Sequence, residues 1–367
     1  MMRVLQVLGK TNLGGAESRI MDLYRHMDRE QIQFDFLIHY KEKGYFDDEI
    51  KKLGGNIYYL PSFRVYNYFE YKKACRRFFE EHSYFAAVHG HMTSTAAIYL
   101  AEAKRAGIPL TIAHARSAGV DKGLKGMLTK LLRMNLYKKC DKMFACSDLA
   151  AEAVFGKKRY EENRVTILPN AVDTKGFLPN EKVRTKLRMK YGLEDKFVIG
   201  HVGRFHYAKN HEFLLKIFAE ILKQKENALL MLLGDGPLKE ETMQQAERLG
   251  IVEKVIFTGN QTPVAPFYQA FDFFLFPSRF EGLPGTVVEA QAAGLKCLIS
   301  DTITKQVKAT ELVNFMSIEK TAKEWADEVL QMQLQPKKEN YNLSETNFDV
   351  NNQVSFYKKV YSGKTIS

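Results

Sequence analysis

Cysteine is scarce in this sequence, and its four cysteines form no Cys-x-x-Cys pair. This excludes a disulfide framework and gives no indication of a structural zinc site. No apolar run reaches the roughly 18 residues that a membrane-spanning helix requires, and the apolar stretch near the N-terminus is too short for a signal peptide. A content of 45% hydrophobic and 26% charged residues is typical of a globular protein, which we expect in the reduced cytoplasm. At 367 residues the chain exceeds one ordinary hydrophobic core, so two domains are expected.

Acidic residues are in short supply in the first half of the chain. Residues 1–172 carry 28 lysines and arginines against 19 acidic residues, whereas residues 173–367 carry 26 against 24. Most of the net charge of +11 therefore lies in the first half. This charge predicts an acidic partner, which could be nucleic acid, an anionic membrane surface or a phosphorylated substrate.

Short β-rich runs alternate with amphipathic helical stretches along the whole chain. Several runs are continuously apolar, which is typical of parallel strands covered on both faces. The scheme occurs twice and predicts an α/β protein with two Rossmann-like, doubly wound domains that face each other across a ligand-binding cleft. The predicted strands are residues 4–8, 34–40, 56–60, 86–89, 110–113, 143–146, 165–168, 197–202, 228–233, 255–258, 273–276, 297–300 and 315–317.

A hinge is predicted at residues 169–173, where the sequence Pro-Asn-Ala-Val-Asp follows a strand and precedes a strongly charged helix. The first predicted domain spans residues 1–170, and the second spans residues 171–349.

One loop after the opening strand of each domain suits a phosphate. Gly14 and Gly15 stand at a helix start, where backbone N–H groups and the helix dipole favour negative charge; an ordinary strand-to-helix turn is the alternative. In the second domain Arg204 and Lys209 follow a strand, and two such cations suit a diphosphate leaving group; a solvated loop is the alternative. Neither loop has the Gly-x-Gly-x-x-Gly spacing of a dinucleotide site, which disfavours a dehydrogenase.

Two glutamates follow the predicted strand 273–276. Glu289 lies among valines and alanines of a predicted helix, which is too apolar a setting for an ordinary solvated carboxylate. Glu281 precedes the start of that helix. A diphosphate bound to the N–H groups of residues 285–287 leaves both carboxylates free for sugar hydroxyls. The segment therefore suits a nucleotide sugar.

Four segments together resemble the family 4 glycosyltransferases of the GT-B fold, in the correct order and over essentially the whole chain. These segments are the Gly14-Gly15 loop, the hinge at residues 169–173, Gly203-Arg204 with Lys209-Asn210, and Glu281-x7-Glu289. Within this family, the sequence is similar to the branch found in capsule and exopolysaccharide gene clusters. The resemblance implies a retaining, metal-independent hexosyltransferase without a cofactor. Its donor would be a nucleoside-diphosphate sugar, foremost a UDP-sugar, and its acceptor a hydroxyl group, foremost of a lipid-linked glycan precursor. It also implies a last helix, within residues 350–367, that returns to the first domain.

The resemblance also implies roles for individual residues. Arg204 and Lys209 would hold the diphosphate, Glu281 would meet the sugar near the reacting carbon, and Glu289 would meet the ribose. Together with His114, the first three of these are the implied catalytic residues. The implied donor-binding residues are Gly14, Gly15, Asn170, Arg204, Lys209, Asn260, Glu281, Leu283, Pro284, Gly285, Thr286, Val287 and Glu289.

The histidines give a weaker signal. His89 and His91 end a strand with no third ligand in view, so no metal site is predicted. His114 follows the predicted strand 110–113 and is expected to open onto the cleft, with a purely structural histidine as an equal alternative.

Residues 122–142 contain seven lysines and arginines, with leucines and methionines at helical spacing. A basic amphipathic helix of this kind predicts contact with an anionic membrane surface, here on the cytoplasmic side. The alternative is that the apolar stripe belongs to the core and the lysines form a solvated face.

Two rival functions remain at this point. A non-hydrolysing nucleotide-sugar epimerase shares the fold but is not expected to carry Glu281-x7-Glu289. A basic, non-enzymatic nucleic-acid-binding protein would interleave exposed aromatic residues with lysine and arginine, whereas the aromatic residues here lie mostly in core-like strands, so we expect no nucleic acid partner.

Overall fold

A computed structural model describes residues 1–116, 123–336 and 342–364. The chain divides into two compact units. Unit 1 comprises Met1–Ala171 with Asp349–Ser367, and unit 2 comprises Val172–Phe348. Each junction lies one residue away from the predicted boundary.

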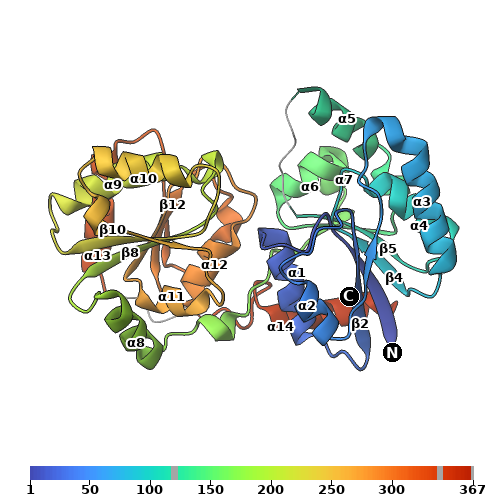
Figure 1. Ribbon diagram of the computed structural model, residues 1–367, viewed down its shortest axis with the longest axis horizontal. Coiled ribbons are helices and arrows are strands. Elements are labelled where there is room, and N and C mark those ends of the chain that lie inside the picture. Colours follow the sequence, from blue (N-terminus) through green and yellow to red (C-terminus); the bar gives the residue numbers. More distant parts are fainter. Residues whose placement is uncertain (117–122, 337–341, 365–367) are drawn as a thin grey trace. The chain divides into compact units, whose positions relative to one another are not determined.

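Unit 1 is built on a parallel sheet of seven strands in the order β3-β2-β1-β4-β5-β6-β7 (Figure 1). Its strands are β1 (Met2–Val7), β2 (Ile32–Ile38), β3 (Ile57–Tyr59), β4 (Ala87–Gly90), β5 (Thr111–Ala115), β6 (Lys142–Ala145) and β7 (Val165–Ile167). Its helices are α1 (Gly15–His26), α2 (Asp47–Lys52), α3 (Tyr68–Glu81), α4 (Ala96–Arg105), α5 (Gly123–Arg133), α6 (Asp148–Phe155), α7 (Lys157–Glu161) and α14 (Val350–Tyr361).

The pleat of this sheet separates two apolar cores. Ile112 of β5 packs with residues of α1, α2 and α14, whereas its neighbour Ala113 packs with residues of α3, α4 and α6. Such alternation follows from the two-residue period of a strand, which turns successive side chains to opposite faces. The predicted return of the last helix to the first domain is confirmed, because α14 packs against α1 in unit 1.

Unit 2 repeats the architecture with six parallel strands in the order β10-β9-β8-β11-β12-β13 (Figure 1). Its strands are β8 (Phe197–Val202), β9 (Ala228–Leu233), β10 (Val255–Gly259), β11 (Phe273–Phe276), β12 (Lys296–Ser300) and β13 (Val313–Met316). Its helices are α8 (Glu181–Tyr191), α9 (His211–Leu222), α10 (Lys239–Arg248), α11 (Ala265–Ala270), α12 (Gly285–Ala292) and α13 (Ala322–Leu334).

The predicted fold class is confirmed: both sheets are parallel and Rossmann-like. Every predicted strand overlaps an observed one. The continuous apolar runs were informative because helices cover both faces of each sheet, so that β2, β9 and β11 are buried along their whole length. Within the described part of the chain, no helix has both the length and the hydropathy needed to cross a bilayer.

Candidate active site

The loop after β8 carries the predicted diphosphate cations. Arg204 is exposed just beyond the end of the strand, and Lys209 ends a short 3-10 turn that begins at Tyr207. A Cβ on Gly203 would come within 3.2 Å of the Lys209 side chain, at its Cδ and Cε. The glycine therefore lets the lysine stem pass close over the backbone.

A second glycine loop, which the sequence reasoning missed, supports this one. Gly234 and Gly236 follow β9 with φ angles of +136° and +157°, a conformation that other residues rarely adopt. A Cβ on Gly234 would lie 2.1 Å from the carbonyl oxygen of Gly203. The signal in the sequence was the Gly-Asp-Gly segment directly after a buried strand.

Lys209 and Glu281 lie next to each other in unit 2. The Lys209 Nζ is 2.7 Å from Glu281 Oε1, and both side chains are only 17% exposed. The ammonium group also lies 4.6 Å from the centre of the Phe276 ring. A diphosphate bound to Lys209 would thus compete with the Glu281 carboxylate for the ammonium group.

Three buried polar atoms around this ion pair have no hydrogen-bond partner among the residues that the structure describes: Asn210 Oδ1, Ser278 Oγ and Thr286 Oγ1. Asn210 Nδ2 donates to the carbonyl of Pro277 (3.0 Å), which ties the Lys209 loop to the loop before α12. Buried polar groups are normally paired, and Thr286 stands in the first turn of α12, where unpaired backbone N–H groups also favour an anion. The two hydroxyls, of Ser278 and Thr286, can donate to a phosphate oxygen, whereas Asn210 Oδ1 can only accept and suits a donor group of a ligand.

Glu289 lies on α12 and is 3% exposed. The hydroxyl of Tyr268, on α11, donates to Glu289 Oε2 (2.7 Å). This partner is 21 residues away and was not predicted from the sequence. The hydrogen bond fixes the orientation of the carboxylate inside an otherwise apolar helix face.

The other predicted donor-binding residues of unit 2 lie at the N-terminus of α12, except Asn260, which follows β10. Leu283 is buried and Pro284 is the N-cap residue of α12, so that Gly285, Thr286 and Val287 form its first turn. Asn260 is exposed directly after β10.

The remaining predicted residues belong to unit 1. Gly14 is the N-cap residue of α1 and Gly15 its first residue. Asn170 is buried, and its Oδ1 accepts a hydrogen bond from Arg116 Nη1 (3.1 Å). Burial raises the pKa of Glu17, in the first turn of α1, while the nearby Arg116 lowers it.

The expectation that His114 follows its strand is wrong. β5 continues to Ala115, so that His114 lies inside the strand and is fully buried. It points to the same face as Ile112, because residues two apart in a strand share a face, and α14 covers that face. Its assignment as a catalytic residue stays a prediction.

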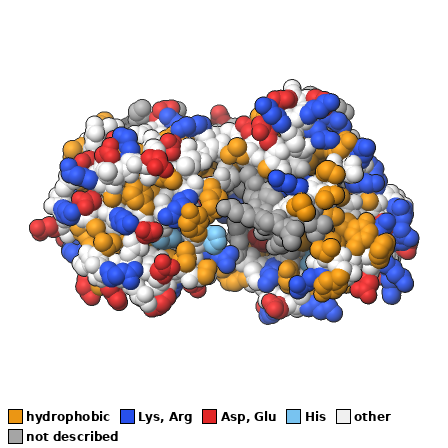
Figure 2. Space-filling model, turned by 90° about the horizontal axis from the view of Figure 1, so that it is seen from above, with side chains coloured by type: hydrophobic (Ala, Val, Ile, Leu, Met, Phe, Trp, Pro, Cys, Tyr) orange, Lys and Arg blue, Asp and Glu red, His pale blue; other side chains and the backbone are white. Residues whose placement is uncertain are grey.

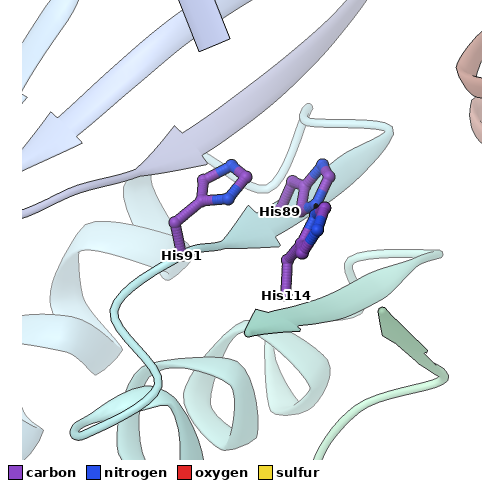
Figure 3. Close-up of side chains that lie close together, drawn as sticks. All are labelled: His89, His91 and His114. Carbon is purple, nitrogen blue, oxygen red and sulfur yellow. Dashed lines mark hydrogen bonds between the residues drawn. The ribbon is translucent and has the colours of Figure 1, made fainter. Parts of the chain in front are cut away.

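Three histidines lie together in the interior of unit 1 (Figure 3). His114 joins His89 and His91, with candidate ligand nitrogens of the three within 4.8 Å of one another. Burial lowers the pKa of all three well below the usual 6.5, and the Arg116 guanidinium lowers it further. The sequence analysis found no third ligand for His89 and His91, because His114 comes from another strand and was considered separately.

The basic segment 122–142 is only partly helical. α5 ends at Arg133; Lys122 lies outside the described residues. Leu136 belongs to the core, whereas Met127, Leu131 and Met134 are between 56% and 61% exposed. The apolar stripe is therefore divided between the core and the surface.

Comparisons with known proteins agree with this architecture. Residues 13–175 match the model of "Glycosyltransferase Family 4", and residues 196–334 match "Glycosyl transferases group 1". The chain is 35% identical to a putative glycosyltransferase, EpsF, of Bacillus subtilis over 99% of this chain and 97% of that protein. It is 24% identical to the capsular polysaccharide biosynthesis glycosyltransferase CapH of Staphylococcus aureus, with full coverage of both.

The fold also matches solved structures. HepE of Anabaena, crystallised with UDP, superposes with a TM-score of 0.79 at 16% identity and covers 98% of this chain and 100% of that one. At this identity the likeness concerns the fold alone. The full-length similarity to EpsF and the two family matches together show that the chain belongs to the family 4 glycosyltransferases of the GT-B fold.

Proposed function

We propose that this glycosyltransferase transfers a hexose-type sugar from a UDP-sugar to a hydroxyl of a lipid-linked glycan precursor, with retention of the anomeric configuration, in exopolysaccharide or capsule synthesis. The observation that carries the proposal is the Lys209–Glu281 ion pair beside the first turn of α12, with its unpaired buried polar atoms. The name of CapH, a capsular polysaccharide biosynthesis glycosyltransferase, supports the pathway, and the UDP bound to HepE supports the nucleotide.

In the proposed reaction the bond from the sugar C1 to the diphosphate breaks and a bond from C1 to the acceptor oxygen forms. The acceptor proton passes to an oxygen of the leaving phosphate. The protein lowers the barrier by holding positive charge, from Arg204, Lys209 and the N-terminus of α12, where negative charge develops. These groups are fixed before the reaction begins, so no reorganisation is needed at that moment. None of these steps uses a metal ion or cofactor.

A thermal-shift screen of UDP-, GDP- and ADP-sugars tests the proposal. A ligand at about a hundred times its dissociation constant adds about 2.7 kcal/mol to the free energy of unfolding. We expect this stabilisation from a UDP-sugar, and we expect it to persist in EDTA. The matches to glycosyltransferases do not favour the epimerase or the nucleic-acid-binding alternative. Conversion of the donor to an epimerised sugar without an acceptor would support the epimerase. Stabilisation by an oligonucleotide alone would support the nucleic-acid-binding protein.

Glu281→Gln and Glu289→Gln are expected to affect different parts of the donor. Glu289→Gln should weaken binding of UDP and UDP-sugar equally, because the proposed contact is to the ribose. Glu281→Gln should leave UDP affinity nearly unchanged and lower turnover, because the proposed contact is to the sugar alone. Calorimetric titration with UDP and with UDP-glucose, together with kcat, measures both effects. A Glu281→Gln variant that weakens UDP and UDP-glucose binding equally contradicts this division.

We further propose that the carboxyl edge of the unit 1 sheet lies on the cytoplasmic leaflet of the membrane. Met127, Leu131 and Met134 are exposed there beside Lys130. Val65, Tyr66 and Phe69, which follow β3, are also exposed, Tyr66 at 88% and Phe69 at 83%. Figure 1 shows α5 at this end of unit 1, and Figure 2 views the molecule from that side, with hydrophobic and basic side chains over unit 1. Such a surface suits anionic lipid.

Vesicle sedimentation tests this surface. Replacing both Lys130 and Lys138 by glutamate should weaken binding to anionic vesicles at least tenfold, since each basic residue near the membrane contributes about 1 kcal/mol. The matched control is the exposed pair Lys182 and Lys186 of α8 in unit 2, changed in the same way and with the same change in net charge. Equal loss in both variants, or equal binding of the parent to neutral vesicles, would refute the surface.

A further inference from the structure

The three histidines of unit 1 are joined by hydrogen bonds to one another and to three residues from other places in the chain: Gln6, Arg116 and Tyr361. Arg116 Nε donates to His91 Nδ1 (3.2 Å), and His91 Nε2 lies 2.9 Å from Gln6 Oε1. Gln6 Nε2 donates to the hydroxyl of Tyr361 on α14 (3.4 Å). That hydroxyl lies 2.7 Å from His89 Nδ1, and His89 Nε2 lies 3.1 Å from His114 Nδ1.

The hydrogen bond from Arg116 to His91 determines which group donates in the next two hydrogen bonds. A guanidinium group can only donate, so the His91 Nδ1 must accept and the proton of this neutral imidazole must be on Nε2. His91 therefore donates to Gln6, which must present its oxygen to His91 and its NH2 group to Tyr361. An amide NH2 group also only donates, so the oxygen of Tyr361 accepts at that point.

The remaining two hydrogen bonds, from Tyr361 to His89 and from His89 to His114, have a fixed donor as well. Burial raises the pKa of Tyr361, which keeps its hydroxyl protonated, and His89 Nδ1 is the acceptor at 2.7 Å for this proton. If His89 donated to Tyr361 instead, the tyrosine O–H would have no described partner, and a buried unpaired donor is unfavourable. His89 thus carries its proton on Nε2 and donates to His114 Nδ1.

We infer that Arg116 sets a one-way hydrogen-bond chain, Arg116 to His91 to Gln6 to Tyr361 to His89 to His114, which holds His114 as the tautomer protonated on Nε2. The Tyr357 hydroxyl also approaches His114 Nδ1, at 3.5 Å; a hydroxyl can donate or accept, so this contact fits the chain without setting its direction. His89, Gln6 and Tyr361 are positioning residues in this chain.

Two consequences follow for the cluster. Each Nδ1 lone pair of the three histidines already accepts a hydrogen bond and each Nε2 carries a proton, so none is free to ligate a cation, and the charge of Arg116 opposes one. His114 Nε2 is buried and has no partner among the described residues. It therefore presents an N–H donor, suited to an acceptor oxygen of a ligand.

On the proposed function, His114 acts by donating a hydrogen bond to a substrate oxygen and not as a base. The part of the inference that concerns the tautomer does not depend on that function, because it can be measured on the free protein.

Nuclear magnetic resonance of protein labelled with ¹⁵N-histidine tests the tautomers, since two-bond and three-bond proton–nitrogen correlations distinguish Nδ1–H from Nε2–H. We expect Nε2–H for His89, His91 and His114. Tyr361→Phe should abolish this preference at His89 and His114. The control Tyr357→Phe, one helical turn away on α14, should keep it, because His89 still donates. An Nδ1–H signal from His114 in the parent, or no change in Tyr361→Phe, would overturn the chain, as would ligation of added Zn²⁺ by these histidines.

A separate experiment tests whether the Nε2–H group of His114 donates a hydrogen bond to the substrate. UDP-glucose should shift the His114 Nε2–H resonance; a shift with UDP as well places the oxygen on the diphosphate, and a shift with UDP-glucose alone places it on the sugar. His114→Gln, whose amide can donate near the Nε2 position, should turn over at least tenfold faster than His114→Asn, which is too short. Equal loss in folded Gln and Asn variants, or no shift in protein that binds UDP-glucose, would overturn this role. Failure to bind any UDP-sugar would instead refute the proposed function and leave the tautomers unaffected.

Discussion

Replacing Lys209 or Arg204 by alanine is expected to lower kcat by about 10²–10³-fold, the usual loss when one fixed group that stabilises transition-state charge is removed. Both cations are proposed to act on the same diphosphate, so the double variant should lose less than the product of the two single losses. The measurement is initial rate of UDP release at saturating donor and acceptor. Lys216→Ala is the matched control, because this lysine is exposed on α9 and pairs only with Glu212 among the described ion pairs.

The Lys209–Glu281 ion pair adds a second variable to this experiment. Lys209→Ala leaves the Glu281 carboxylate without its partner in a partly buried site, which disturbs the site beyond the loss of one cation. Comparing Lys209→Ala in the parent with Lys209→Ala in the Glu281→Gln background separates the two effects. Near-normal turnover in either single variant, Arg204→Ala or Lys209→Ala, would show that the assignment to the leaving group is wrong.

Unit 1 is expected to lose stability more steeply than unit 2 as the pH falls from 6.5 to 5. Burial lowers the pKa of His39, His89, His91 and His114 in unit 1. Because the unfolded chain has the higher histidine pKa, near 6.5, it binds more protons than the folded state below that pH, and protonation favours unfolding. Each histidine that stays neutral in the folded state adds one proton to the difference between the two states, so four such histidines give unit 1 a steep dependence on pH.

Unit 2 provides the internal comparison. Burial lowers the pKa of His201 to about 3 and that of His211 to about 2, so the same argument gives a shallower dependence on pH for two histidines. Hydrogen exchange followed by mass spectrometry measures both units, and the fluorescence of Trp325, the one tryptophan in the chain, reports on unit 2. Equal slopes for the two units above pH 5, where carboxylates contribute little, would contradict the prediction.

The fold class and the segments of the proposed donor site could be predicted from the sequence alone. Periodicity and apolar runs located the strands because helices cover both faces of each sheet. A strand buried on both faces needs apolar residues at consecutive positions, and this pattern is visible within a short segment. The Glu281–Glu289 spacing and the Arg204–Lys209 loop were likewise recognisable because each set lies within one short segment. The sequence could not predict which apolar residues of segment 122–142 are exposed. Apolar residues at helical spacing occur both on helices packed against a core and on helices that lie on a membrane surface.

Contacts between residues far apart in the sequence became visible only in the folded chain. It placed Lys209 against Glu281 and Tyr268 against Glu289. It also extended β5 through His114 and brought Tyr361 to His89 across 272 residues. The physical reason is that a residue pattern encodes which face of a strand or helix is apolar, but not which other element covers that face. Hydrogen-bond partners, and with them the protonation of the histidines, depend on strand order and on the return of α14, and these are set by packing of the whole unit.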